Sequence, residues 1–287
     1  MSTTTEGVEH QVDYALQRTP LEYERLRAQA LVWEPATVRV LDRIDLAPGA
    51  TCLDAGCGPG ETMRLLARRV GPDGAVTGID VDAALGTLAE TALHESGHRQ
   101  CRVRAVELTG DAPVPGAPYD LVFARLLLFH LPQRVPVLSR LWDAVAPGGH
   151  LVVQDYDLHA LDVVPSLASV DEVVRVVVDT FGALGCDIRA GARLPGMFAQ
   201  AGAGEPDGTD VTGRVEPLAK GHRILEQTFR SVLPAAIAHD VTDPKHADAV
   251  LAALRRDAAR LPDTSMVWPL MVGAWKQKRR GSQLANS

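Results

Sequence analysis

The sequence lacks several features that define large classes of proteins. No apolar run reaches the roughly 18 residues of a membrane-spanning helix, so we expect no membrane protein. The four cysteines, at positions 52, 57, 101 and 186, have no C-x-x-C spacing, which predicts reduced thiols and no metal site. The polar, acidic first residues carry no signal-peptide pattern, which favours a cytoplasmic protein.

Clustered basic residues are also scarce. The chain has 29 Lys and Arg against 36 Asp and Glu, a net charge of −7, and its one basic cluster is Lys276–Arg280. A protein that binds nucleic acid usually presents a basic face, so a nucleic-acid partner is disfavoured. The composition, 46% hydrophobic and 23% charged, is that of an ordinary globular chain.

The most informative stretch is Leu53–Gly60, which reads LDAGCGPG. A short apolar run precedes it, and Met63, Leu66 and Val70 follow at helical spacing, which predicts a glycine-rich turn between a strand and a helix. Glycine permits a sharp bend and lets a ligand approach the backbone closely. The start of the helix also offers N–H groups to that ligand.

Two ligand classes use such a turn. Dinucleotide-binding proteins carry a third glycine three residues after the second, but Glu61 occupies that position here and would repel a pyrophosphate. The spacing is instead Gly56-x-Gly58-x-Gly60, with Asp54 directly after the strand. This form resembles motif I of the class I S-adenosylmethionine methyltransferases, whose cofactor carries no phosphate. The alternative is a tight turn that binds no ligand.

Strand-like and helix-like segments alternate along the first half of the chain, which predicts βαβ units and a parallel sheet. The expected strands are 50–53, 75–80, 102–106, 119–124, 150–154, 210–215 and 268–275. The expected helices are 20–33, 35–46, 61–70, 82–96, 133–145, 166–184, 193–201, 220–239 and 246–261. We expect one domain over residues 1–287, with an N-terminal helical lid at 1–46, a cofactor-binding core at 47–157 and substrate-side helices with the last two strands at 158–287.

Acidic residues follow the second and third expected strands. Asp80 stands where a carboxylate accepts two hydrogen bonds from ribose hydroxyls, while the alternative role, capping the next helix, suits Asp82 better. Val81 would then pack on an adenine. Glu107 can accept the exocyclic amine of the adenine, and Leu108 can cover the ring. The alternatives for Glu107 are a surface turn, or replacement in this role by Asp111.

Several motifs together resemble the class I S-adenosylmethionine (SAM) methyltransferases. They are LDAGCGPG, GIDVD, the acid after the third strand, YDLVFARLLLFHLP and APGGHLVVQD, in the order and spacing of that family. Segments 14–33 and 191–202 resemble its branch that modifies small molecules. The resemblance implies an α/β, Rossmann-like sheet of seven mostly parallel strands with helices on both faces. It also implies an N-terminal helical lid and a helical insertion between the last strands.

The resemblance also implies SAM as the cofactor. The cofactor-binding residues expected from it and from the strand ends are Tyr14, Arg25, Gln29, Asp54, Gly56, Gly58, Asp80, Val81, Glu107, Leu108 and Arg125. Gly56 and Gly58 would lie near the methionine end, and Arg125 near the amino-acid moiety. Arg25 and Gln29 would belong to a lid over the cofactor, with a solvated surface pair as the alternative.

The resemblance implies that the segment after the fourth strand, which contains His130, borders the substrate pocket. His130 is therefore a candidate general base for a hydroxyl acceptor. The alternative is a histidine packed among its apolar neighbours, and Asp155, Tyr156 and His222 are weaker candidates. The predicted function is SAM-dependent methylation of a small organic molecule, in specialised metabolism. The rivals are a nucleotide-dependent oxidoreductase and a catalytically silent SAM-binding protein. Assembly as a homodimer stays open.

Overall fold

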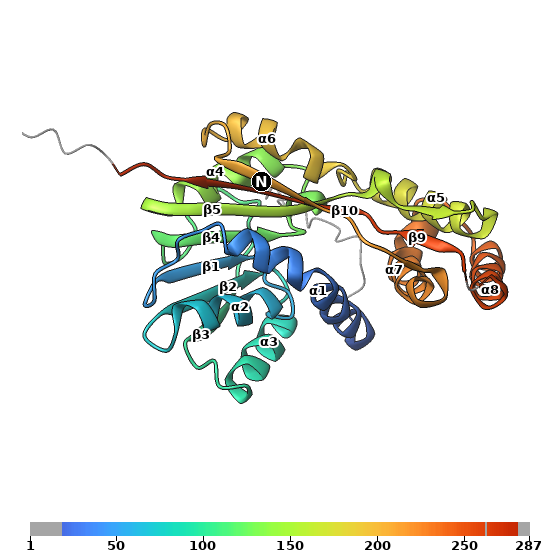
Figure 1. Ribbon diagram of the computed structural model, residues 1–287, viewed down its shortest axis with the longest axis horizontal. Coiled ribbons are helices and arrows are strands. Elements are labelled where there is room, and N and C mark those ends of the chain that lie inside the picture. Colours follow the sequence, from blue (N-terminus) through green and yellow to red (C-terminus); the bar gives the residue numbers. More distant parts are fainter. Residues whose placement is uncertain (1–18, 262, 281–287) are drawn as a thin grey trace, which may run out of the picture.

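A seven-stranded sheet forms the centre of this computed structural model, which describes residues 19–261 and 263–280. The strand order is β3-β2-β1-β4-β5-β10-β7 (Figure 1). The strands are β1 Thr51–Ala55, β2 Ala75–Asp80, β3 Cys101–Ala105, β4 Tyr119–Arg125, β5 Val145–Asp157, β7 Gly208–Thr212 and β10 Leu270–Gln277. Strands β1 to β5 are parallel, and β10 is antiparallel to β5 and β7. The predicted fold class is therefore confirmed.

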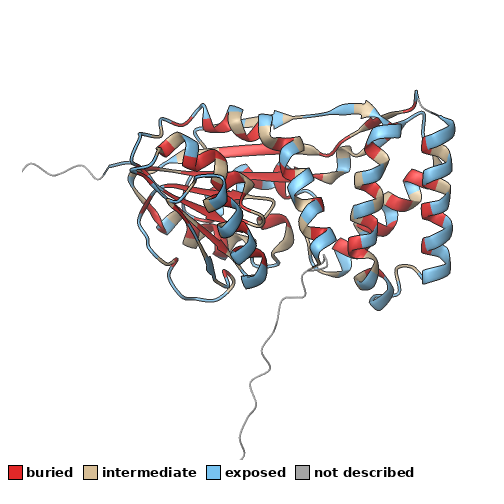
Figure 2. Cartoon of the chain, turned by 90° about the horizontal axis from the view of Figure 1, so that it is seen from below, coloured by how far each residue is buried: buried red, intermediate tan, exposed pale blue. Residues whose placement is uncertain are grey.

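Helices pack on both faces of this sheet. They are α1 Pro20–Leu41, α2 Glu61–Val70, α3 Ala83–Glu95, α4 Arg134–Asp143 and α6 Ala190–Gln200. Helices α5 Ala168–Ala183, α7 Leu218–Ala238 and α8 Pro244–Arg260 pack mainly against one another, and two short 3-10 turns are η1 Leu128–His130 and η2 Leu158–Ala160. Strand β4 shows how one strand serves two cores, because Leu121 and Phe123 join the cluster under α2 while Val122 and Ala124 join the cluster on the opposite face. The central strands β1, β4 and β5 are mostly buried and the edge strands β3 and β7 are partly exposed, whereas the surrounding helices have one buried and one exposed face (Figure 2).

The N-terminal helix differs from the prediction. Two helices were expected, 20–33 and 35–46, but α1 is continuous and contains Pro35. Proline in a helix interior removes one backbone hydrogen bond and crowds the preceding turn. The helix continues because both halves are anchored in the core, Trp33 and Val40 being 2% and 0% exposed. Tertiary packing outweighs the local preference to end at Pro35.

A second sheet was not predicted. It consists of β6 Asp162–Val164, β9 Ser265–Val267 and β8 Val215–Pro217, paired antiparallel in that order. Strands of three residues are too short to show an alternating pattern. Together with α5, α7 and α8, this small sheet extends the molecule beyond the ends of β5 and β10 (Figure 1). Within the described ranges, no helix is long and apolar enough to cross a membrane.

Candidate functional site

A cavity of about 410 Å³ lies at the carboxyl ends of β1, β2, β4 and β5, beneath α1. In open α/β sheets, ligands bind at these strand ends because the connecting loops converge there. The predicted residues that line it are Arg25, Gln29, Asp54, Gly56, Gly58, Asp80, Val81, Glu107, Leu108, Arg125 and His130. Tyr14, also predicted, lies outside the described residues. The fold thus brings together side chains from five separate segments, and their individual roles stay predictions.

The glycine turn between β1 and α2 has the sharp bend that its sequence predicts. Gly56, Gly58 and Gly60 have φ of +70°, +50° and +81°, in the left-handed region. A Cβ on Gly56 would lie 3.0 Å from a side-chain carbon of Leu127. A Cβ on Gly58 would meet no atom within 4 Å, so Gly58 leaves the approach to the turn open.

Asp80 braces this turn. Its Oδ2 accepts a hydrogen bond from the Gly58 N–H at 2.9 Å, and its Oδ1 accepts one from the Asp82 N–H at 2.9 Å. The helix cap of α3 is Asp82, whose Oδ1 accepts from the N–H groups of Ala84 and Leu85. A carboxylate has about four acceptor positions, so the bonds of Asp80 to the backbone leave its ribose role compatible with the geometry.

Asp54 and Arg125 form a buried pair of charges beside the turn. Burial raises the pKa of Asp54 to about 7, opposed by the charge of Arg125. Burial lowers the pKa of Arg125, whose Nη1 donates to Thr37 Oγ1 at 3.0 Å. Asp54 Oδ2 accepts no hydrogen bond within the described structure. A buried carboxylate oxygen without a donor is costly, and a ligand that carries an ammonium group would supply one.

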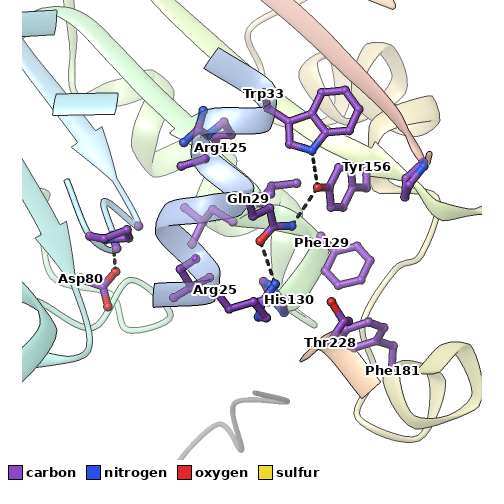
Figure 3. A pocket seen from close by; sticks show the side chains of 18 of the residues that line it. Arg25, Gln29, Trp33, Asp80, Arg125, Phe129, His130, Tyr156, Phe181 and Thr228 are labelled. Atoms are coloured by element: carbon purple, nitrogen blue, oxygen red, sulfur yellow. Dashed lines mark hydrogen bonds between the residues drawn. The ribbon is translucent and has the colours of Figure 1, made fainter. Parts of the chain in front are cut away.

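The face of α1 that carries Arg25 and Gln29 points toward the cavity, so the surface alternative is wrong. Arg25 is 3% exposed and forms a bidentate ion pair with Glu22, at 2.8 Å and 2.6 Å. Its Nη1 donates to Gln29 Oε1 at 3.1 Å, and Gln29 Nε2 donates to the Tyr156 hydroxyl oxygen at 2.8 Å (Figure 3). This chain of contacts joins α1 to β5.

The predicted adenine end is more mixed. Val81 is 46% exposed, which suits an apolar residue that a bound ring would cover. Leu108 is 5% exposed and lines the cavity. Glu107 Oε1 accepts hydrogen bonds from the N–H and hydroxyl of Thr109, at 2.9 Å and 2.8 Å, so it also stabilises a surface turn. The geometry is therefore compatible with both alternatives for Glu107, contact with an adenine and stabilisation of a surface turn.

His130 lies on η1 with its ring edge-on to two aromatic rings. The ring centroids are 4.8 Å from Phe129 and 6.1 Å from Phe181. Burial, with a contribution from the positive charge of Arg25, lowers the pKa of His130 to about 3. The imidazole is therefore neutral at pH 7 and a weak proton acceptor.

The weaker catalytic candidates lie in different places. Asp155 is buried behind η1, where its Oδ2 accepts from the Phe129 N–H at 2.9 Å and so positions the His130 segment. His222 bonds the Leu218 carbonyl on its own helix and does not line the cavity. Of the three, Tyr156 is the one that reaches the cavity.

The residues of the far part of the cavity, which we call the apolar chamber, were not predicted individually, although substrate-side helices were expected within 158–287. It is lined by Val173, Val174, Val177, Val178, Phe181, Ile224, Leu225, Thr228, Met266 and Trp268. Figure 3 shows Asp80 on one side of α1, and Phe181 with Thr228 on the other. The valine-rich periodicity of 166–184 predicts a helix with a buried face, but nothing local indicates that this face borders a ligand cavity. No group of three or more His, Cys, Asp or Glu side chains suited to a metal ion occurs in the described part of the chain.

Comparison with known proteins agrees with this architecture. Residues 52–149 match a family model described as "Methyltransferase domain". A trans-aconitate 2-methyltransferase of Azoarcus sp. (strain BH72) is 36% identical over 115 residues, which cover 40% of this chain and 42% of that protein. The methyltransferase str3 of Strobilurus tenacellus is 26% identical, with 82% and 83% covered. The crystal structure of the YcgJ protein from Bacillus subtilis superposes with a TM-score of 0.57 and 15% identity, covering 86% of this chain and 100% of that one.

The strand order, the glycine turn and the acid at the end of β2 define the Rossmann-like fold of the class I methyltransferases. Together with the family-model match, they identify a methyltransferase domain over residues 52–149 of this fold. The chain spans about two fifths of the length of the trans-aconitate methyltransferases that it matches.

The residues present fit the family's cofactor. The unpartnered Oδ2 of Asp54 suits the ammonium group of SAM, and the open space over Gly58 admits its amino-acid end. Asp80 and Val81 lie at the next strand end, where a ribose and an adenine would follow.

Proposed function

We propose that the protein transfers a methyl group from SAM to a small organic molecule. The observation that carries this proposal is one continuous cavity that joins the glycine turn and Asp80 to the apolar chamber beneath α1. When bound, SAM supplies a methyl group that its sulfonium already makes electrophilic. Binding and orientation are then the main tasks of the protein.

Each side of the cavity has its own part in this proposal. Asp54 and Arg125 would hold the ammonium and carboxylate groups of the cofactor, and Asp80 would hold its ribose. Helix α1 would cover the cavity and exclude water, because its Trp33 and Gln29 side chains are hydrogen-bonded to Tyr156 on β5. The apolar chamber would bind the acceptor.

His130 remains our proposed general base. It lines the cavity, and its lowered pKa leaves the imidazole neutral and able to accept a proton. The same low pKa makes it a weak base, so we expect its contribution to lie at the lower end of the roughly 10²–10⁴-fold range of general bases.

The relatives support a small-molecule acceptor, since one of them is named for trans-aconitate. The apolar chamber gives no support to trans-aconitate itself, because a polycarboxylate needs cationic partners and none of the residues that define the chamber is charged. We infer a place in specialised metabolism, a reducing cytoplasmic location suited to the free cysteines, and no nucleic-acid partner.

Calorimetric titration tests the proposal. S-adenosylhomocysteine, the demethylated product, should bind to the purified protein, whereas NAD should not. Binding of NAD alone would favour the rival oxidoreductase. Transfer of a radiolabelled methyl group from SAM into cell-extract metabolites would then separate an active enzyme from a silent SAM-binding protein, which would bind the product but transfer nothing.

A further inference from the structure

We propose that the methyl acceptor is an uncharged, predominantly apolar molecule and that the Tyr156 hydroxyl donates a hydrogen bond to its polar group. This inference rests on the proposed function, because it describes what occupies the apolar chamber during methyl transfer.

The walls of the apolar chamber come from three elements that share one chemistry. Helix α5 contributes four valines and Phe181, α7 contributes Ile224, Leu225 and Thr228, and β9 contributes Met266. Trp268 completes the lining, and its indole N–H already donates to Glu216 Oε1 at 2.8 Å. Apart from that N–H, the Thr228 hydroxyl is the only polar side-chain group among these chamber residues. Transfer of a charged group into such surroundings is costly unless an opposite charge pairs with it.

The cations nearest to this chamber are already engaged. Among the described residues that line the whole cavity, the arginines are Arg25 and Arg125. Arg25 is held in the bidentate ion pair with Glu22. Arg125 faces Asp54 and donates to Thr37. Neither is left to neutralise an anionic acceptor, so the electrostatics favour a neutral one.

Tyr156 is the polar group best placed to orient such a molecule. Its hydroxyl oxygen accepts from Gln29 Nε2 at 2.8 Å and from Trp33 Nε1 at 2.6 Å. A phenolic oxygen has two acceptor positions and one O–H donor. Both acceptor positions are therefore occupied, and the hydroxyl is left to act as a donor. Within the described residues, no side chain or backbone group accepts that hydrogen.

The proton also stays on the oxygen at neutral pH. Burial raises the pKa of Tyr156 to about 12, despite the two hydrogen bonds that it accepts. A buried O–H without an acceptor favours a ligand that supplies one, such as a carbonyl, ether or ring nitrogen. Because Gln29 and Trp33 belong to α1, a bound acceptor would also be linked to the helix that covers it.

The test uses three probes of the same size class: 2-acetylnaphthalene, naphthalene and 2-naphthoate. Each is titrated calorimetrically into the full-length protein saturated with S-adenosylhomocysteine. We expect 2-acetylnaphthalene to bind at least about tenfold more tightly than naphthalene, and 2-naphthoate to bind more weakly than both, since one hydrogen bond to a buried donor is worth about a factor of ten.

Tyr156→Phe isolates the hydroxyl. This variant should lose the preference for 2-acetylnaphthalene over naphthalene, while naphthalene affinity changes less than about threefold. A merely structural role would weaken both neutral probes equally. Tyr119→Phe is the matched control, because that hydroxyl donates to the Pro115 carbonyl away from the cavity and its loss should keep the preference.

The outcomes separate this inference from the proposed function. Failure of S-adenosylhomocysteine to bind would overturn the proposed function. If it binds but 2-naphthoate binds as tightly as the neutral probes, or no neutral probe binds, the acceptor class proposed here is wrong. A preference for 2-acetylnaphthalene that survives in Tyr156→Phe would overturn the role of the hydroxyl.

Discussion

Replacing Asp54 by asparagine should stabilise the protein and weaken its binding of cofactor. Asp54 is 2% exposed, and its Oδ2 accepts no hydrogen bond in the described structure. The substitution keeps the shape of the side chain and removes the buried charge. We therefore expect the carboxylate of Asp54 to contribute to cofactor binding and to lower the stability of the folded protein.

The magnitude follows from the pKa of this group. Burial raises the pKa of Asp54 from 3.8 to about 7, so between these values the folded protein holds a proton that the unfolded chain has lost. The free energy of unfolding therefore falls as pH rises through this window, and the full penalty is present above pH 7. At about 1.4 kcal/mol per pKa unit, the penalty is on the order of 4 kcal/mol, an upper bound since the new amide is also buried.

Urea unfolding at several pH values measures the effect. The stability advantage of Asp54→Asn over the parent should grow by about 2 kcal/mol between about pH 5.5 and pH 8. Asp120→Asn is the matched control for binding, because this exposed carboxylate accepts from Thr51 at the opposite end of the sheet and its replacement should leave the affinity for S-adenosylhomocysteine unchanged. The affinity of Asp54→Asn for S-adenosylhomocysteine should fall roughly 10-fold to 100-fold. A stability difference that does not vary with pH would refute the reasoning.

Three further substitutions have distinct expected outcomes. Asp80→Ala should weaken S-adenosylhomocysteine binding roughly 10–100-fold, as measured by calorimetry, through loss of charge-assisted bonds to the ribose and of the brace on the glycine turn, while Asp120→Ala should leave it unchanged. His130→Ala should lower kcat roughly 10²-fold with cofactor affinity kept if the imidazole is a base; a loss of melting temperature with kcat within about tenfold would instead indicate a packing role. Gly56→Ala should cost about 1–2 kcal/mol in urea unfolding for its positive φ, and more if Leu127 cannot move away from the new methyl group; an unchanged midpoint would contradict this.

The sequence by itself predicted residues that the fold brings together around one part of the cavity, while their roles toward a cofactor stay predictions. The spacing of Gly56 and Gly58 after an apolar run, and the acid at position 80, are local signals, because a turn with positive φ and a strand end each restrict the residue types that fit. The same reasoning separated Asp80 from the helix cap Asp82, as the hydrogen bonds confirm.

Contacts between distant segments could not be predicted from local sequence patterns. Pro35 signals the end of a helix, yet α1 continues because Trp33 and Val40 are packed in the core. An arginine such as Arg25 is expected to be exposed when only the sequence is considered. Its burial depends on the ion pair with Glu22 one turn earlier and on the cavity that Arg25 lines.

The proposed acceptor half was decided by tertiary structure alone. Gln29 and Trp33 meet Tyr156 across more than a hundred residues of sequence, at separations of 127 and 123. The valines of α5 have the periodicity of any buried helix face, and only the approach of α7 and β9 turns that face into the wall of a chamber. Hydrophobic periodicity predicts which side chains are buried, because burial depends on the chemistry of each side chain. Which residues a buried side chain then contacts depends on how the whole chain folds.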